Sequence, residues 1–198
     1  DAGPTIRWTV AESLRAQGRC AEALRLYASL VAGDKKPRAE LLMAYAECRF
    51  RTGDYAGTLE SLRGVGAGSA VAGDAAYLRF KAAEALHHAS ATPDSAAQLF
   101  ELAGAFADAY PRHRRIYEAR FRLGEMLRDR GERLEAVAQF DEVTGEPTFR
   151  VQALYQSAQC YAEEWEVRAR RDGVDAAREL ADGAIERLDR FIGEAGGL

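Results

Sequence analysis

Two adjacent histidines, His87 and His88, have side chains that can hold a metal ion or titrate near neutral pH. Neighbouring residues on a helix point about 100° apart, so the two imidazoles are poorly placed to share one metal ion. We therefore expect solvated histidines near a helix end. The acidic residues Glu163, Glu164 and Glu166 fit a surface helix, since a general-acid pair would need a buried cleft.

Three cysteines, Cys20, Cys48 and Cys160, are odd in number and lie far apart in the sequence. Cys48 and Cys160 fall within expected helices, among Ala, Leu and Tyr. Small buried apolar residues explain them better than a disulfide does. No CxxC or Cys/His spacing indicates a zinc site, so we expect no bound metal.

Basic side chains cluster at residues 112–115 and 168–171, where they could contact phosphate or an acidic partner. Interleaved aromatic residues are missing, and the net charge of -4 argues against a nucleic-acid partner. We expect both clusters to be solvated. The sequence has no nucleophile elbow, phosphate loop or HExxH motif, so we expect neither enzyme activity nor a cofactor.

The composition is that of a folded protein, with 47% hydrophobic and 29% charged residues among 198. No apolar run approaches the roughly 18 residues that a membrane span needs. The sequence starts at Asp1 and not at Met, which suggests a processed mature chain or a piece of a longer one. A removed signal peptide would leave no trace, so this feature leaves the compartment open.

A fixed pattern of small, large apolar and glycine residues recurs along the chain, and it indicates the helices that would position any functional site. The offsets 3, 7, 12, 16 and 19 from Gly124 give Leu127, Gly131, Ala136, Phe140 and Val143. The same offsets from Ala11 give Leu14, Gly18, Ala23, Tyr27 and Leu30. Less regular copies start at Ala46, near Ala83 (resuming at Ala96, Phe100 and Ala103) and at Ala158.

Each position of this pattern has a physical role. The small starting residue lets two helices approach closely, the glycine makes the turn between them, and the aromatic residue fills space toward the next pair. These features resemble the tetratricopeptide repeat, a helix-turn-helix unit of about 34 residues. The resemblance implies an all-α, right-handed α-solenoid of about five such pairs plus a C-terminal capping helix, in a single domain. The expected repeats cover residues 5–36, 38–70, 74–108, 115–147 and 150–192.

Three segments depart from the repeat. Residues 64–74 are a glycine-rich connection, residues 87–98 replace the glycine turn with a longer loop, and residues 109–115 break the pattern. After Tyr161 we expect an extended helix, a break near Gly173 and a last amphipathic helix. The Tyr110-Pro111 junction is similar to junctions in bacterial cell-envelope repeat proteins, such as outer-membrane assembly lipoproteins and periplasmic division-coordinating proteins.

In this family the first helix of each pair lines a concave groove, and its positions two, five, six, nine, twelve and thirteen point inward. Carried over to this sequence, position five holds Trp8, Met43, Phe80, Phe121 and Tyr155. Position nine holds Glu12, Glu47, Glu84, Glu125 and Gln159. The two rows are four residues apart, so each pair lies on one helix face. The resemblance thus implies a groove with a mostly aromatic row beside an acidic row.

An alternative interpretation makes the same residues structural. The position-five side chains would pack against neighbouring repeats. The glutamates would pair with nearby arginines, namely Arg15, Arg51, Arg122 and Arg128. The combination of both rows slightly favours the groove. Family members that clamp a carboxylate tail use Lys, Asn and Arg inside the groove, whereas this sequence has no Asn and an acidic inner row, so it does not resemble that subgroup.

The resemblance implies a non-catalytic scaffold that binds a peptide segment or partner domain. Family analogy favours bacterial envelope assembly, with the periplasm preferred to the cytoplasm. Two alternatives stay open: a regulatory or targeting module of a larger enzyme or signalling protein, and a self-assembling oligomerisation unit.

Overall fold

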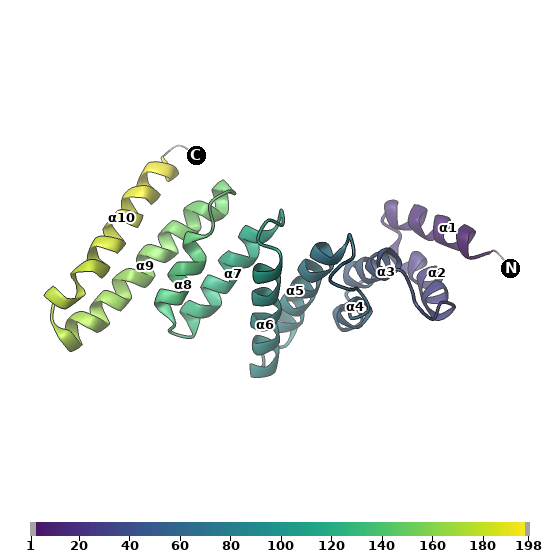
Figure 1. Cartoon of the computed structure of the whole chain (residues 1–198), viewed down its shortest axis with the longest axis horizontal. Helices are drawn as coiled ribbons and strands as arrows, with labels where there is room; N and C mark the ends of the chain where they lie inside the picture. The colour runs from purple at the N-terminus through teal and green to yellow at the C-terminus, as the bar shows by residue number, and fades with distance from the viewer. Residues whose placement is uncertain (1–2, 197–198) are drawn as a thin grey trace. The chain divides into compact units, whose positions relative to one another are not determined.

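The computed structural model describes residues 3–196, and every regular element in that range is a helix (Figure 1). In chain order the elements are α1 (Pro4–Ala16), α2 (Cys20–Ala32), α3 (Ala39–Arg51), α4 (Tyr55–Leu62), α5 (Ala72–Ala89), α6 (Pro93–Ala109), α7 (Ile116–Asp129), α8 (Arg133–Asp141), α9 (Pro147–Asp172), the short 3-10 helix η1 (Asp175–Ala177) and α10 (Arg178–Ala195).

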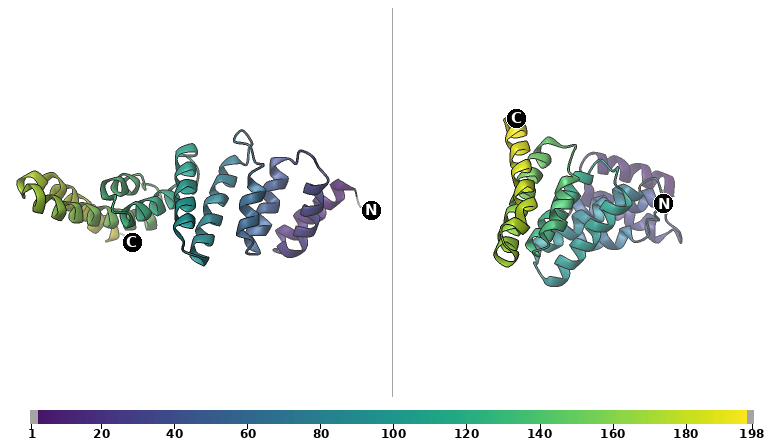
Figure 2. Two further views of the ribbon diagram at one scale, coloured as in Figure 1. Left: turned by 90° about the horizontal axis from the view of Figure 1, so that it is seen from below. Right: turned by 60° about the vertical axis from the view of Figure 1, so that its left-hand side comes forward.

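Consecutive helices pack as hairpins: α1 with α2, α3 with α4, α5 with α6, α7 with α8, and α9 with α10. The expected all-α array of about five helix pairs is therefore confirmed over the described residues. The expected capping helix is α10, which is also the second member of the fifth pair. Figure 2 shows α9 and α10 side by side from two further directions.

The chain divides into two compact units at the junction of Ala109 and Tyr110. The first unit contains α1 to α6, and the second contains α7 to α10. This division differs from the single domain expected over residues 1–198. It falls where the sequence pattern breaks at residues 109–115. The segment between α6 and α7 contains Pro111 and consists of turns without a regular helix.

Glycines make the tight turns within three of the pairs, as the repeat pattern predicts. Gly18, Gly53 and Gly131 have φ values of +77°, +84° and +80°. Residues with a Cβ atom rarely adopt this left-handed conformation, so glycine is favoured at each position. Gly173, with φ of +95°, likewise ends α9 at the predicted break.

The third pair departs from the sequence expectation. The connection between α5 and α6 is only residues 90–92 and not a long loop, because α5 continues through Ala89. Thr92 and Ser95 exchange hydrogen bonds of 3.0 and 3.1 Å between backbone N–H and hydroxyl groups, which fixes the start of α6. Of the three positions expected on α6, Ala103 is fully buried, whereas Ala96 is exposed and Phe100 is half-buried. Leu99 and Phe106 are buried on this helix instead.

Each unit has its own apolar core. In the first unit, Ala11, Ala23 and Tyr27 pack with residues of α3, and all three are fully buried. In the second unit, Phe140 lies against Phe121, with ring centroids 5.6 Å apart. Gly124 permits this contact, since a Cβ atom at Gly124 would lie 2.5 Å from a ring carbon of Phe140. The small residue at the start of the repeat therefore has the close-packing role that the sequence predicts.

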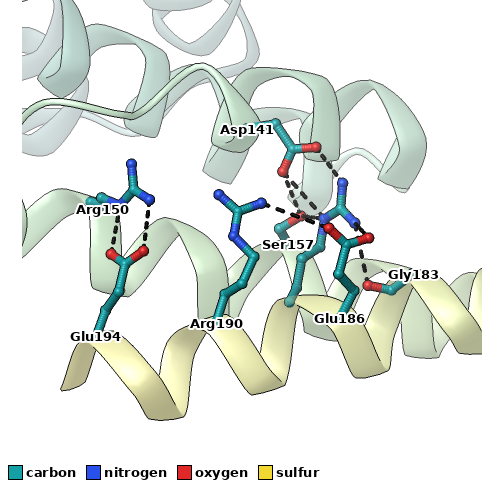
Figure 3. A network of polar contacts seen from close by, with 8 residues as sticks. Asp141, Arg150, Ser157, Gly183, Glu186, Arg190 and Glu194 are labelled. Carbon is teal, nitrogen blue, oxygen red and sulfur yellow. Dashed lines mark hydrogen bonds and ion pairs between the residues drawn. The ribbon is translucent and has the colours of Figure 1, made fainter. Parts of the chain in front are cut away.

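Polar contacts attach α10 to the rest of the second unit (Figure 3). Arg187 has only 12% of its side chain exposed, and it forms an ion pair with Asp141 of α8. Its Nε donates to the hydroxyl of Ser157 on α9 at 2.9 Å, and its guanidinium lies 4.5 Å from the ring centre of Tyr161. Arg150 donates two hydrogen bonds to the carboxylate of Glu194, at 2.5 and 2.6 Å. These contacts fix α10 against both α8 and α9.

Candidate functional site

The predicted position-five row is not a continuous exposed surface. Phe80, Phe121 and Met43 are 0%, 5% and 8% exposed, so the alternative interpretation as core residues is correct for these three. Trp8 is half-buried, and Tyr155 is 42% exposed. The rings of Phe80 and Phe121 are buried because they fill space between packed helices.

The position-nine row carries little free negative charge. Arg15 pairs with both Glu12 and Glu47, at 2.7 and 2.6 Å. Lys81 pairs with Glu84, and Arg122 pairs with Glu125 at 2.7 Å. In the fifth pair, Gln159 donates a hydrogen bond to the hydroxyl of Tyr155 at 3.0 Å.

Arg15 and Arg122 therefore have the pairing role that the alternative interpretation gave them. Arg128 instead donates to the side chains of Gln156 and Asp129. Arg51 forms no ion pair with a described residue. Arg15, Lys81 and Arg122 together pair with all four inner glutamates, so the row is not the unpaired acidic surface that the sequence suggested.

The hydrogen bonds around Glu12 stabilise the ionised form of its carboxylate. Burial raises the pKa of Glu12, but hydrogen bonds from Arg15 and Tyr27 outweigh burial and hold the pKa below its usual value of 4.5. The hydroxyl of Tyr27 donates to Glu12, and burial together with the Glu12 carboxylate raises the pKa of Tyr27. Glu12 is thus an ionised structural group that connects α1 with α2 and α3.

One hollow of about 600 Å³ lies in the first unit and contains Trp8; we call it the Trp8 hollow. Arg7, Lys36 and Arg38 contribute positive charge to it, and Asp34 is its one carboxylate. The Arg38 guanidinium lies 4.2 Å from the ring centre of Trp8. Its walls are Pro4, Thr5, Arg7, Trp8, Ser29, Leu30, Gly33, Asp34, Lys36, Arg38 and Leu41.

A second hollow, of about 400 Å³, lies between α7 and α9 in the second unit; we call it the Tyr155 hollow. It brings together three predicted site residues, Phe121, Glu125 and Tyr155. The complete lining is Phe121, Arg122, Glu125, Phe149, Gln152, Tyr155 and Gln156. Trp8, Met43, Phe80 and their partner glutamates lie in the first unit and do not contribute to this hollow.

The Tyr155 hollow combines an aromatic floor with amide groups. The ring centroids of Phe121 and Phe149 are 5.5 Å apart, and those of Tyr155 and Phe191 are also 5.5 Å apart. Within the described part of the chain, the exposed amide of Gln152 forms no hydrogen bond. Such an amide can both donate to and accept from a peptide backbone.

Some lining residues were missed from the sequence, although a signal for them existed. Arg122 and Gln156 occupy position six of their helices, and Gln152 occupies position two. Both positions point inward in the repeat family, but only positions five and nine were assigned as site residues. Phe149 lies before the aligned helix positions, so the repeat pattern gave no indication of it.

The histidine pair is not at either hollow. His87 is half-buried and lies with Nδ1 2.9 Å from the hydroxyl of Ser95, while His88 is exposed near the end of α5. Among residues 3–196, no cluster of three His, Cys, Asp or Glu side chains is arranged to hold a metal ion. The helices of this same range include none with the length and apolar character to cross a lipid bilayer.

No protein-family model matches the sequence, and no curated protein matches it. Solved structures do match its fold. MamA superposes with a TM-score of 0.62 at 16% identity, over 94% of this chain and 92% of MamA. YrrB, a TPR protein with an unusual peptide-binding site, gives 0.59 at 20% identity, over 95% of this chain and 89% of YrrB.

A TPR repeats protein from Bacteroides fragilis, BF2334, has a TM-score of 0.61 at 12% identity, over 98% of this chain and 91% of that protein. At these identities the similarity concerns the fold. The helix pairs, the glycine turns and the buried small and aromatic positions agree with it. The chain therefore has the tetratricopeptide-repeat fold.

Proposed function

We propose that this chain is a non-catalytic protein-interaction scaffold, and that the Tyr155 hollow binds an extended peptide segment of a partner protein. The observation that carries the proposal is the combination of the 42%-exposed Tyr155 ring with the free amide of Gln152 in one hollow. Exposed tyrosines supply contact area at low entropic cost and are common at binding hot spots. YrrB, which has the same fold, is itself a peptide-binding protein.

The charges of the hollow indicate what kind of peptide fits. Arg122 and Glu125 are its two charged residues, and they neutralise each other at 2.7 Å. A strongly charged peptide would gain little from this balance and would lose hydration. We therefore propose a neutral segment, whose backbone bonds to Gln152 and Gln156 and whose apolar side chain contacts Tyr155.

The predicted site residues contribute to this proposal unequally. Phe121 forms part of the floor, while Glu125 and Tyr155 provide accessible groups. Gln159 orients the Tyr155 hydroxyl without lining the hollow. Trp8 stays a predicted contact for a second segment at the Trp8 hollow. Glu12 is bonded to Arg15 and Tyr27 and does not line that hollow. Met43 and Phe80 support the helices from inside.

Selection of peptides from a random phage-displayed library tests the proposal. We expect the wild-type chain to enrich neutral sequences, and the Gln152→Ala/Tyr155→Ala double variant to enrich none of them. Val167→Ala is the matched control, because Val167 is 45% exposed on the same helix but does not line the hollow. Enrichment of the same peptides by the double variant, or of no peptide by the wild type, would overturn the proposal.

Self-assembly is a second candidate function, and exposed apolar residues on the terminal helices favour it. Ile185, Leu188 and Ile192 of α10 are 56%, 40% and 66% exposed, at helical spacings of three and four. On α1, Ile6 and Val10 are 59% and 46% exposed and are one turn apart. Within this chain the first helix of a pair packs on the second helix of the pair before it, as α3 does on α2 and α9 does on α8. We propose that α1 of one copy packs on α10 of another in the same way.

Sedimentation velocity over a range of concentrations distinguishes this second function. The wild type should associate as concentration rises, while Ile192→Glu should remain monomeric with the same helical content. Val167→Glu, an equally exposed apolar position on α9, serves as the control and should associate like the wild type. A wild-type chain that stays monomeric throughout would exclude the assembly.

We propose a bacterial cell envelope as the setting of the scaffold, on the resemblance carried by the Tyr110-Pro111 junction. A role as the regulatory module of a larger protein is the competing proposal. Fractionation of cells that express the full-length gene product separates the two. Recovery of the protein with the envelope supports the first, and recovery with a cytoplasmic enzyme domain on the same chain supports the second.

A further inference from the structure

Two cysteines that are far apart in the sequence meet inside the first unit. Cys20 is the first residue of α2, and Cys48 lies near the end of α3. Their Sγ atoms are 2.8 Å apart, although 28 residues separate them in the chain. The side chains are 3% and 0% exposed, in the core cluster that also contains Ala11 and Tyr27.

The separation of the two sulphur atoms is close to that of a bond. A disulfide has an S–S length of about 2.05 Å, so the atoms need to approach by only about 0.8 Å. The helices α2 and α3 already pack against each other as the second helix of one pair and the first helix of the next.

We propose that Cys20 and Cys48 form a disulfide that links the first helix pair to the second. The oxidant is a disulfide compound, such as glutathione disulfide or a disulfide-carrying protein. One cysteine thiolate attacks the oxidant disulfide and releases one thiol, and the other cysteine then displaces the second thiol from the mixed disulfide. The two protein thiols together lose two protons and two electrons, and the oxidant is reduced to two thiols.

Burial determines when this bond can form. Desolvation and the hydrogen bond with Cys20 raise the pKa of Cys48 to about 12, so little thiolate exists in the folded chain at neutral pH. Because the thiolate is the reactive form, the folded and reduced protein should oxidise slowly. The bond should form readily during folding, before α2 and α3 close over the two side chains.

Cys160 provides an internal control. It lies on α9 in the second unit and is fully buried. Burial raises its pKa to about 11. Cys20 and Cys48 lie against each other in the first unit, and Cys160 does not take part in that contact. We therefore expect Cys160 to remain a free thiol under conditions that join Cys20 to Cys48.

Refolding with glutathione disulfide, followed by tryptic digestion without reductant, tests the proposal. Cleavage after Arg releases residues 20–25, 39–49 and 151–168 as the three cysteine-containing peptides. We expect residues 20–25 and 39–49 as one joined species, lighter than the sum of the two reduced peptides by two hydrogen atoms. Free residues 20–25 and 39–49, or a species that contains residues 151–168, would overturn the proposal.

Thermal unfolding gives an independent readout. A disulfide that closes a loop of this size is expected to raise the Tm of the first unit by roughly 5–15 °C relative to the reduced protein. Cys20→Ala should lose this difference between oxidised and reduced samples, and Cys160→Ala should keep it. If Cys20→Ala does not fold, Cys48→Ala provides the same comparison. An unchanged Tm on oxidation of the wild type would contradict the link.

Discussion

Arg15 on α1 donates a hydrogen bond of 2.6 Å to the carboxylate of Glu47 on α3. The same guanidinium donates to Glu12 one turn earlier on α1 at 2.7 Å, so one cation joins the glutamates of two successive repeats. Repeat folds gain their stability from contacts between neighbouring units. The inner glutamates of the first unit therefore help to hold successive repeats together.

Removal of this cation should weaken the first unit measurably. Arg15 and Glu47 are 29% and 31% exposed in their side chains, so solvent screens their attraction only in part. We expect Arg15→Leu to lower the free energy of unfolding by about 1 kcal/mol. A double-mutant cycle with Glu47→Gln isolates the pair. A coupling energy of zero, measured by urea denaturation, would show that the contact does not stabilise the array.

Glu12 should make the first unit sensitive to acid. Its folded-state pKa is lowered, so its stabilising contribution is complete above the usual value of about 4.5 and is lost as pH falls through the folded pKa. When the pH is lowered from neutral to below about 4.5, the Tm of the Glu12→Gln variant should therefore fall by less than the Tm of the wild type. Glu22→Gln is the control, because the Glu22 pair with Arg19 is more than half exposed. Equal acid sensitivity in the wild type and Glu12→Gln would contradict the assignment.

The repeat spacing predicted much of the core correctly. Ala11, Ala23, Tyr27, Ala136 and Phe140 all came from the offsets, and none is more than 2% exposed. Such positions are predictable because helix periodicity and the glycine turn are local properties of the sequence. The third pair was less predictable: Ala103 is buried as expected, but Leu99 and Phe106 are buried in place of Ala96 and Phe100.

The candidate site was less predictable than the fold. Phe80 and Tyr155 occupy the same repeat position, yet one is fully buried and the other is 42% exposed. The difference depends on neighbouring helix pairs, and a position within one repeat does not encode it. The meeting of Cys20 with Cys48 was missed for the same reason, since it results from the stacking of two pairs.

Close helix packing at Gly124 gives a prediction with a matched control. A Cβ atom at Gly124 would overlap the Phe140 ring, so Gly124→Ala should destabilise the second unit by about 1–3 kcal/mol. A Cβ atom added at Gly104 in α6 would have no neighbouring atom within 4 Å. Gly104→Ala should instead stabilise the first unit by about 0.5–1 kcal/mol. Thermal unfolding of both variants checks this prediction. A change of Tm in the same direction for Gly124→Ala and Gly104→Ala would contradict it.

Buried and exposed members of the position-five row should respond differently to truncation. Phe80→Ala and Phe121→Ala should each cost about 3–5 kcal/mol, because both rings lie in a packed core. Tyr155→Ala should cost much less and leave the helical circular dichroism unchanged. Chemical denaturation of the three variants checks this order. A loss for Tyr155→Ala as large as for Phe121→Ala would place Tyr155 in the core as well.

The central claim is that the Tyr155 hollow binds a peptide, and fluorescence-anisotropy titration of a library-selected peptide tests it most directly. We expect Tyr155→Ala to weaken binding at least about tenfold, as removal of a hot-spot ring does, while Val167→Ala on the same helix binds like the wild type. Unchanged affinity in a folded Tyr155→Ala variant would contradict the claim.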